Sequence, residues 1–276
     1  MFSENEELKR KQSRSLGIFQ SFQKVCEEHN LHYFLSGGTL LGCVRHEGFI
    51  PWDDDMDIAM PREDYEELIK IANRFLPDYY RLDHFSLCSE NDMPLTHHVQ
   101  IVDTRTEMTK SWTVTQRKTS VWIDVFPLDG LPMNAVRRKA HLLHGRFWWL
   151  IMQLTWFKDN VNIKKNRPFP EKVAISALMH LPAAKSRLVI KVLNRFDRTA
   201  KKYPFTSSDK ICSFHGTYGS KELLDREWYE KGTTMPFEGI PCNIPSAYDK
   251  VLKHYYGSYE IPKEEKNRHE CSVIKL

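Results

Sequence analysis

A cluster of carboxylates follows a glycine pair in the first quarter of the chain. Gly37 and Gly38 follow the apolar run 33–35 after one residue, Ser36. A group of acids comes next: Asp53, Asp54, Asp55 and Asp57. If residues 53–58 form a strand, side chains alternate between its two faces, so Asp53, Asp55 and Asp57 share one face. Carboxylates that crowd together raise one another's pKa unless a cation lies among them. The pattern therefore predicts a cation site.

The ligand chemistry indicates which cation this would be. Oxygen ligands, with no histidine or cysteine nearby at a regular ligand spacing, favour Mg²⁺, or Mn²⁺, over Zn²⁺. A calcium loop of the EF-hand type needs a glycine at its sixth position and a glutamate at its twelfth, but counting from Asp53 these positions hold Ile58 and Asp64. This template is excluded. A solvated acidic turn after Pro51 stays open as the alternative to a metal site.

The residues between the apolar run and the acids are suited to bind phosphate. A glycine pair at the end of a strand lets backbone N–H groups approach a phosphate closely, and a helix beginning at Thr39 or Leu40 would add its N-terminal dipole. Arg45 could clamp a phosphate oxygen, whereas His46 could equally be a surface or structural histidine. We place the candidate phosphate-binding group at Ser36, Gly37, Gly38, Thr39, Arg45 and His46. Acids and glycines together indicate metal-assisted phosphoryl transfer.

A further acid lies alone in an apolar segment. Residues 121–126 are rich in aromatic and β-branched side chains and contain the single acid Asp124, which predicts a buried strand with one carboxylate. A buried charge is costly unless it is paired or bound to a metal. Asp124 is therefore a candidate metal ligand, and an ion pair with an arginine such as Arg117 is the alternative.

The order of these residues resembles the LicD family, which is named for phosphocholine transferases acting on bacterial surface glycans. The resemblance is carried by Gly37-Gly38-Thr39-Leu40-Leu41-Gly42, then Arg45-His46, then Gly48-Phe49-Ile50-Pro51-Trp52-Asp53-Asp54-Asp55 with Asp57. More distantly, the pattern is similar to fukutin-type ribitol-phosphate transferases and to the nucleotidyltransferase fold. Two later motifs also recur in LicD-like chains, Tyr218–Glu222 and Pro262–His269, although both could simply mark turns packed against the core.

The resemblance implies a metal-dependent transfer of phosphocholine, or a related phospho-alcohol, from a CDP-linked donor such as CDP-choline. The acceptor would be a hydroxyl of a cell-surface glycan, such as lipopolysaccharide, teichoic acid or capsule, and CMP would be released. Asp55, Asp57 and Asp124 would hold Mg²⁺, Asp53 would assist them, and Asp124 would help to remove the hydroxyl proton. Two alternatives stay open: a nucleotidyltransferase that moves a nucleoside monophosphate, and a non-catalytic scaffold for glycan assembly.

Composition limits the partners and the compartment. The chain has 276 residues, 41% of them hydrophobic, and its 40 basic and 36 acidic residues give a formal charge of +4, which is too mild to predict nucleic acid as the main partner. Six cysteines are spread singly along the chain, a pattern that favours reduced thiols in the cytoplasm. The N-terminal residues are charged and lack the apolar core of a secretory signal.

Periodicity predicts an α/β protein with a mixed sheet, and the resemblance implies that this sheet is nucleotidyltransferase-like. Amphipathic helices are expected over 4–30 and 61–75, and strands over 79–87, 97–102 and 121–126, which together form an α/β core over residues 1–133. Residues 134–276 are expected to be mostly helical, with helices over 173–180 and 187–201. In the sheet, Asp124 is expected beside Asp55 and Asp57.

The segment Phe147–Phe157 has an unusual composition. It contains three of the seven tryptophans and follows Arg137, Arg138, Lys139 and Arg146. Eleven residues cannot span a bilayer as a helix. The segment is either a core helix or lies among lipid headgroups, where it would suit a lipid-linked acceptor. We therefore expect a cytoplasmic protein with a possible peripheral contact at the inner membrane surface.

Overall fold

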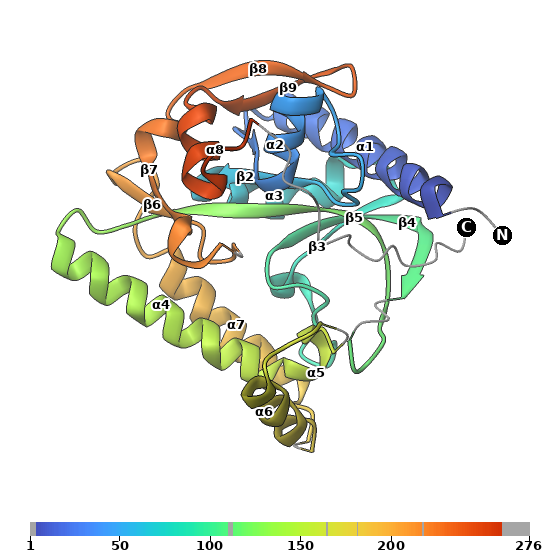
Figure 1. The fold of residues 1–276 in the computed structure, drawn as a ribbon, viewed down its shortest axis with the longest axis vertical. Coiled ribbons are helices and arrows are strands. Elements are labelled where there is room, and N and C mark those ends of the chain that lie inside the picture. The colour runs from blue at the N-terminus through green and yellow to red at the C-terminus, as the bar shows by residue number, and fades with distance from the viewer. Residues whose placement is uncertain (1–3, 110–112, 164, 181, 217, 261–276) are drawn as a thin grey trace.

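The structure, a computed structural model, describes residues 4–109, 113–163, 165–180, 182–216 and 218–260. Its centre is a mixed sheet in the order β1-β2-β5-β4-β3, extended by β6 on β5 and by β7 on β6 (Figure 1). The strands are β1 (Phe34–Leu35), β2 (Asp57–Pro61), β3 (Tyr80–Asp83), β4 (Val99–Thr109), β5 (Lys118–Gly130), β6 (Lys210–Cys212) and β7 (Leu223–Asp225). The α/β fold predicted from the sequence is confirmed.

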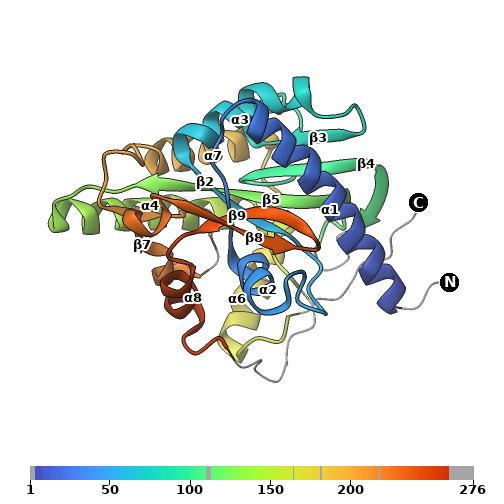
Figure 2. The same cartoon turned by 90° about the horizontal axis from the view of Figure 1, so that it is seen from above.

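Helices cover both faces of this sheet. The helices α1 (Glu4–Glu28) and α3 (Arg62–Phe75) lie on one face, and α2 (Gly37–His46) and α8 (Tyr248–Tyr256) lie on the other (Figure 2). A hairpin of β8 (Gly232–Phe237) and β9 (Ile240–Pro245) packs beside β1 and α2. Short 3₁₀ helices span Phe85–Leu87, Gly219–Glu222 and Arg226–Tyr229.

A separate helical layer flanks the sheet. It consists of α4 (Ala135–Thr155), α5 (Phe157–Asn160), α6 (Phe169–Met179) and α7 (Ser186–Ala200). Met152 and Trp156 pack with Leu193 and Phe196 of α7 in a second hydrophobic core. In the segment 147–157, Met152 and Trp156 are therefore core residues, as predicted for a core helix, although other side chains of the same segment face solvent.

The sheet register brings the two predicted acidic segments together. Strands β2 and β5 run parallel with Asp57 opposite Asp124, and β4 runs antiparallel to β5 with Gln100 opposite Asp124. The expected position of Asp124 beside Asp57 is confirmed. Because side chains alternate along a strand, β5 presents Asp124 on one face of the sheet and Asp129 on the other.

The predicted strand over residues 53–58 is wrong at its start. Strand β2 begins only at Asp57, and residues 53–56 form no strand. The chain turns there, and the N–H of Asp53 donates to the carbonyl of Ile50. The side chain of Asp54 pairs with Lys11 of α1. Alternation along a strand therefore does not apply to Asp53, Asp54 and Asp55.

Several other boundaries also differ from the expectations. Helix α2 begins at Gly37 rather than at Thr39 or Leu40, β3 ends at Asp83, and β4 runs from Val99 to Thr109. In the region expected to be mostly helical, β6 to β9 accompany the helices. The division of the chain at residue 133 stays a prediction, and the motif Pro262–His269 lies outside the described residues.

Candidate active site

Asp57 is held at the start of β2 by the loop that precedes α2. Its N–H donates to the hydroxyl oxygen of Thr39 at 2.8 Å, and its carbonyl accepts from the N–H of Ser36 at 2.9 Å. Two polar residues at the N-terminus of α2 therefore fix the backbone from which this carboxylate projects. Ser36 and Thr39, predicted to bind phosphate, thus form hydrogen bonds with the backbone of Asp57.

The glycine pair lies directly against the carboxylates. A Cβ atom on Gly37 would lie 2.6 Å from Oδ2 of Asp57, and one on Gly38 would lie 2.7 Å from Oδ2 of Asp53. Gly37 also has a positive φ of 52°, a backbone angle that residues with a Cβ atom rarely adopt. The N-terminus of a helix favours negative charge through its free N–H groups and its dipole. Both glycines are thus required by the close approach of two carboxylates, and their contact with a phosphate stays a prediction.

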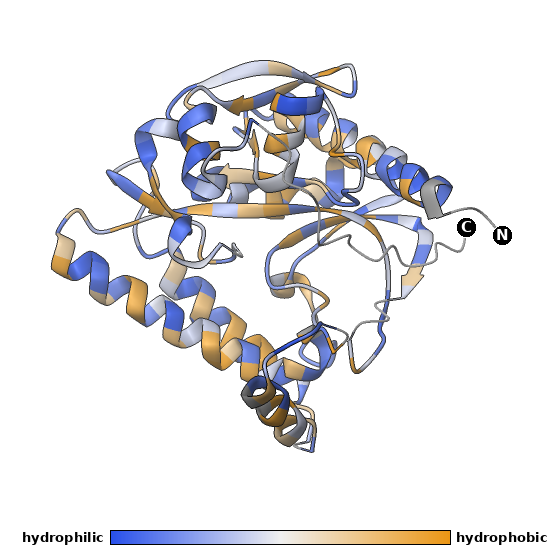
Figure 3. Ribbon diagram, viewed as in Figure 1, coloured by the Kyte–Doolittle hydropathy of each residue, from blue (hydrophilic) through white to orange (hydrophobic). Residues whose placement is uncertain are grey.

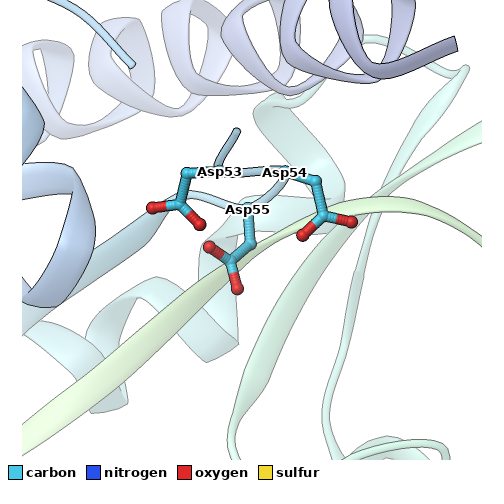
Figure 4. Close-up of side chains that lie close together, drawn as sticks. All are labelled: Asp53, Asp54 and Asp55. Atoms are coloured by element: carbon cyan, nitrogen blue, oxygen red, sulfur yellow. The ribbon is translucent and has the colours of Figure 1, made fainter. Parts of the chain in front are cut away.

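Asp53, Asp54 and Asp55 form the second part of the cluster and lie close together (Figure 4). Each offers a carboxylate oxygen within 4.8 Å of the others. Asp54 forms a buried ion pair with Lys11 of α1, with 2.5 Å between Nζ and Oδ2. Its charge is therefore already compensated. We define the acid cluster as Asp53, Asp55, Asp57 and Asp124.

The acid cluster is electrostatically unfavourable as it stands. Burial, followed by the charge of Asp55, raises the pKa of Asp53 to about 8. Burial and the charges of Asp55 and Asp124 raise the pKa of Asp57 well above its usual value. Among the described residues, no lysine or arginine forms an ion pair with Asp53 or Asp57. Hard oxygen ligands in this setting fit a divalent cation such as Mg²⁺ or Mn²⁺.

Asp124 has a different environment from its neighbours. Its Oδ1 accepts from Nε2 of His98 at 2.6 Å and from Nε2 of Gln100 at 2.8 Å, and its Oδ2 accepts from Nε1 of Trp122 at 2.8 Å. Burial alone would raise the pKa of Asp124, but His98 and these hydrogen bonds hold it below the usual value. Since a carboxylate has about four acceptor positions, one remains for a metal. Such a well-stabilised anion is a weak base, so a ligand role fits Asp124 better than removal of a proton.

The segment that contains Asp53, Asp57 and Asp124 is similar to known proteins. Residues 30–143 match the family described as LicD/FKTN/FKRP, nucleotidyltransferase domain. The lipopolysaccharide cholinephosphotransferase LicD of Haemophilus influenzae is 28% identical over 269 residues, which cover 94% of this chain and 93% of that protein. We call residues 30–143 the LicD domain after this similarity. This confirms the resemblance predicted from the motifs.

A shorter match extends the similarity to animal proteins. The human ribitol 5-phosphate transferase FKRP is 48% identical over 40 residues, which cover 14% of this chain but only 8% of that protein. An uncharacterized protein of Rickettsia prowazekii is 40% identical over 65 residues, covering 22% of this chain and 24% of that protein. Both matches are short, so they add less than the similarity over nearly the whole chain.

The LicD domain does not bring all of the predicted binding residues together. Arg45 and His46 lie in the last turn of α2, about 12 Å along the helix from Gly37 at 1.5 Å per residue. Nη2 of Arg45 is buried with no hydrogen-bond partner among the described residues. A buried donor of this kind is suited to bind an anion. His46 is exposed. The phosphate-binding roles of both stay predictions.

Sequence reasoning missed several residues around the acid cluster of the LicD domain. His98 and Gln100 could have been found, because they alternate along a predicted strand and so share one face. Glu222 lies outside the matched segment, yet its charge acts on Asp57. Burial raises the pKa of Glu222 to about 7 although the N–H of Tyr218 donates to its Oε1 at 3.0 Å. The motif Tyr218–Glu222, read as a turn, thus supplies an acid near the site.

Proposed function

We propose that this chain transfers a phosphocholine or related phospho-alcohol group from a CDP-linked donor to a hydroxyl of a cell-surface glycan, releasing CMP. The observation that carries the proposal is the acid cluster, which gathers Asp57 of β2, Asp124 of β5 and two acids of the preceding turn at the N-terminus of α2. The similarity to a lipopolysaccharide cholinephosphotransferase over nearly the whole chain supports the same chemistry.

Within this proposal, Asp55, Asp57 and Asp124 hold Mg²⁺, or Mn²⁺, and Asp53 adds a further oxygen. A bound divalent ion would neutralise charge on the donor diphosphate and stabilise the entering and leaving oxygens. His98, Gln100 and Trp122 keep Asp124 ionised and fixed in orientation. Ser36 and Thr39 fix the backbone of Asp57, and Gly37 and Gly38 leave room for the carboxylates at the helix N-terminus.

The remaining binding roles follow from the position of unused donors. The free N–H groups at the N-terminus of α2 are available to a donor phosphate beside the acid cluster. Arg45, with its unpartnered guanidinium nitrogen, is proposed to bind an anionic group farther along the donor or acceptor. Which alcohol the donor carries depends on a pocket that this geometry leaves open.

A test of the proposal is turnover of CDP-choline, CDP-glycerol and CDP-ribitol with Mg²⁺, followed by CMP release, with and without EDTA. We expect CMP from one donor, lost with EDTA and in Asp57→Asn. The surface variant Asp83→Asn serves as the matched control, since Asp83 pairs with Arg81 away from the acid cluster. Release of pyrophosphate from a nucleoside triphosphate would favour nucleotidyl transfer instead. No product from any donor, with candidate glycans added, would favour the scaffold.

The proposed compartment is the cytoplasm, with a peripheral contact at the inner membrane surface where a lipid-linked acceptor would be found. Within the described residues, no helix combines the length and the apolarity that crossing a membrane requires.

A further inference from the structure

Helix α4 presents a row of apolar side chains to solvent along its whole length. At about 100° per residue, these side chains fall within about 60° of the helix circumference. We call them the α4 stripe. Its members, with their exposed fractions, are Val136 (78%), Leu143 (59%), Phe147 (52%), Leu150 (46%) and Leu154 (55%).

The opposite side of α4 already forms its packing contacts. The buried residues His141, Gly145 and Met152 lie there, about half a turn away from the α4 stripe. A Cβ on Gly145 would lie 2.2 Å from the ring of Phe214, so the chain packs tightly on that side. In Figures 1 and 3, α4 forms an outer edge of the molecule and carries hydrophobic residues along it. The described fold therefore does not use the α4 stripe.

Basic residues lie on both sides of the stripe. By helical geometry, Arg137 flanks it on one side and Lys139 and Arg146 flank it on the other, and all three are exposed. Helix α4 contains no aspartate or glutamate. Within the part of the chain that the structure describes, these three side chains form no ion pair with a carboxylate. The stripe thus lies between uncompensated positive charges.

The charge of the chain is strongly asymmetric around this helix. Residues 134–200 contain fourteen lysines and arginines but only three acids, whereas acids outnumber basic residues in the rest of the chain. The mild formal charge of +4 conceals this separation. A surface of this sign attracts an anionic partner, and the attraction to anionic lipids grows with each basic residue near the surface.

We propose that the α4 stripe docks on an anionic membrane surface, with α4 lying in the plane of the headgroups. The helix has 21 residues, so it offers a contact about 31 Å long. Helices of this kind bury an apolar face among the headgroups while basic side chains on either side bind anionic lipid. A second copy of the chain is a poor occupant, because two such basic faces would repel each other at a symmetric interface.

The docked helix would bring the acid cluster near the membrane. Trp156 follows α4 directly, and its ring lies 6.4 Å from that of His97. Nε2 of the next residue, His98, donates to Oδ1 of Asp124 at 2.6 Å. The residue at the C-terminal end of α4 therefore lies beside the segment that positions Asp124. The use of this arrangement for a lipid-linked acceptor rests on the proposed function, whereas docking itself does not.

Co-sedimentation with vesicles tests the docking. We expect the full chain to bind vesicles of phosphatidylcholine mixed with phosphatidylglycerol, to bind pure phosphatidylcholine weakly, and to be released by salt. Leu143→Ser with Phe147→Ser should weaken binding about tenfold or more. The matched control is Phe75→Ser with Leu87→Ser, which removes two equally exposed apolar side chains elsewhere. An unchanged melting temperature shows that each variant folds.

The charged flank is tested separately. The triple variant Arg137→Gln, Lys139→Gln and Arg146→Gln should weaken binding to anionic vesicles by about 100-fold and reduce its salt dependence. Its control is Lys24→Gln, Lys70→Gln and Lys253→Gln, which removes the same charge from exposed positions on other helices.

Two results would overturn the docking proposal. The first is wild type that binds neither kind of vesicle, which is also the result expected if a second copy or an acidic protein occupies the stripe. The second is equal weakening in the stripe variants and in their controls. Release of CMP from a soluble donor should be unchanged in the stripe variants, so this readout separates failure of docking from failure of the proposed reaction.

Discussion

Strand β5 places two acids, the partly buried Asp124 and the buried Asp129, on opposite faces of the sheet. The two faces surround their acids with different charges. On the side of α3, Asp129 accepts from Arg62 twice, with 2.6 Å from Nε to Oδ1 and 3.1 Å from Nη2 to Oδ2. Nη1 of Arg62 also donates to Asp197 of α7 at 2.9 Å. We call these three residues the Arg62 cluster. Each of its carboxylates has a cation in contact.

On the side of α2, the acid cluster has no such partner for Asp53 or Asp57 among the described residues. The pKa values of Asp197 and Asp57 report the contrast, although at Asp129 burial outweighs Arg62 and raises the pKa to about 6. Burial would raise the pKa of Asp197, but Arg62 and Lys201 lower it, whereas burial and neighbouring acids raise the pKa of Asp57. The Arg62 cluster is complete within the chain and joins α3, β5 and α7. In the proposed function an added cation compensates the acid cluster, which is the usual difference between a structural and a functional group of buried charges.

The largest expected effect is the loss of activity when an acid of the acid cluster is neutralised. Asp57→Asn should lower the proposed turnover by three to four orders of magnitude, because it removes a metal ligand worth several kcal/mol in the transition state. In EDTA the same variant should be at least as stable as wild type, since it relieves repulsion between buried charges. Turnover assays and urea unfolding measure the two effects. A variant that loses activity only because it unfolds would contradict the assignment.

The Arg62 cluster should respond in the opposite sense. Arg62→Met leaves Asp129 and Asp197 buried without their guanidinium and should cost about 3–5 kcal/mol of stability. Urea unfolding measures this cost. The control is Arg81→Met, which breaks an exposed pair with Asp83 and should cost at most about 1 kcal/mol. Equal losses in the two variants would show that the Arg62 cluster contributes no more stability than an exposed ion pair.

Sequence reasoning located the acid cluster for identifiable reasons. Asp57 and Asp124 lie in apolar strands that the β-branched and aromatic residues mark clearly, and α1 and α3 are long enough for their periodicity to be read. The expected position of Asp124 beside Asp57 came from the resemblance, which implies that acids of two strands share one metal site. The parallel register of β2 and β5 places the two residues opposite each other.

The residues that were missed depend on contacts between distant parts of the chain. Strand β6 is three residues long and exists because Cys212 pairs with Asp129 of β5. Glu222 reaches the acid cluster from a segment whose turn residues carry no sign of that neighbour. Asp54 belongs to a run of three similar acids, and only the position of Lys11 on α1 distinguishes it. Local patterns do not contain such information.

A smaller effect is expected in the pH dependence of stability. In the folded chain the pKa of Asp53 is raised by burial and by Asp55 to about 8, above its value of about 3.9 in an unfolded chain. The folded state then holds a proton that the unfolded state releases, so the free energy of unfolding falls as pH rises from about 4 to about 8. In EDTA, Asp53→Asn should therefore gain stability over wild type as pH rises, by on the order of 2 kcal/mol at pH 8.

Urea unfolding of both proteins at pH 5 and pH 8 measures this gain. Saturating Mg²⁺ should reduce it, because a bound cation stabilises the ionised wild-type carboxylates and not the amide. Asp197 provides the opposite reference, since its lowered pKa contributes stability that is lost only as pH falls below about 4. A gain for Asp53→Asn that is the same at pH 5 and pH 8 would contradict the raised pKa.

The smallest effect decides what the glycine pair is for. In Gly38→Ala the new Cβ would lie 2.7 Å from Oδ2 of Asp53 and must displace that carboxylate, so affinity for Mn²⁺ alone should fall about tenfold, or by about 1.4 kcal/mol. The control is Gly232→Ala, where the nearest atom outside the backbone neighbours is 3.5 Å away. Titration of Mn²⁺ without nucleotide measures the difference.

If Gly38 instead serves only to admit a donor phosphate, Mn²⁺ affinity would be unchanged and only the KM for the donor would rise. Alanine also favours a helix over glycine by up to about 1 kcal/mol, so a general loss of stability is not the expected cause of weaker metal binding. A fall in metal affinity at unchanged or higher stability would show that the N-terminus of α2 is shaped around the carboxylates. The uncompensated charge on this face of the sheet would then lie against the glycine pair.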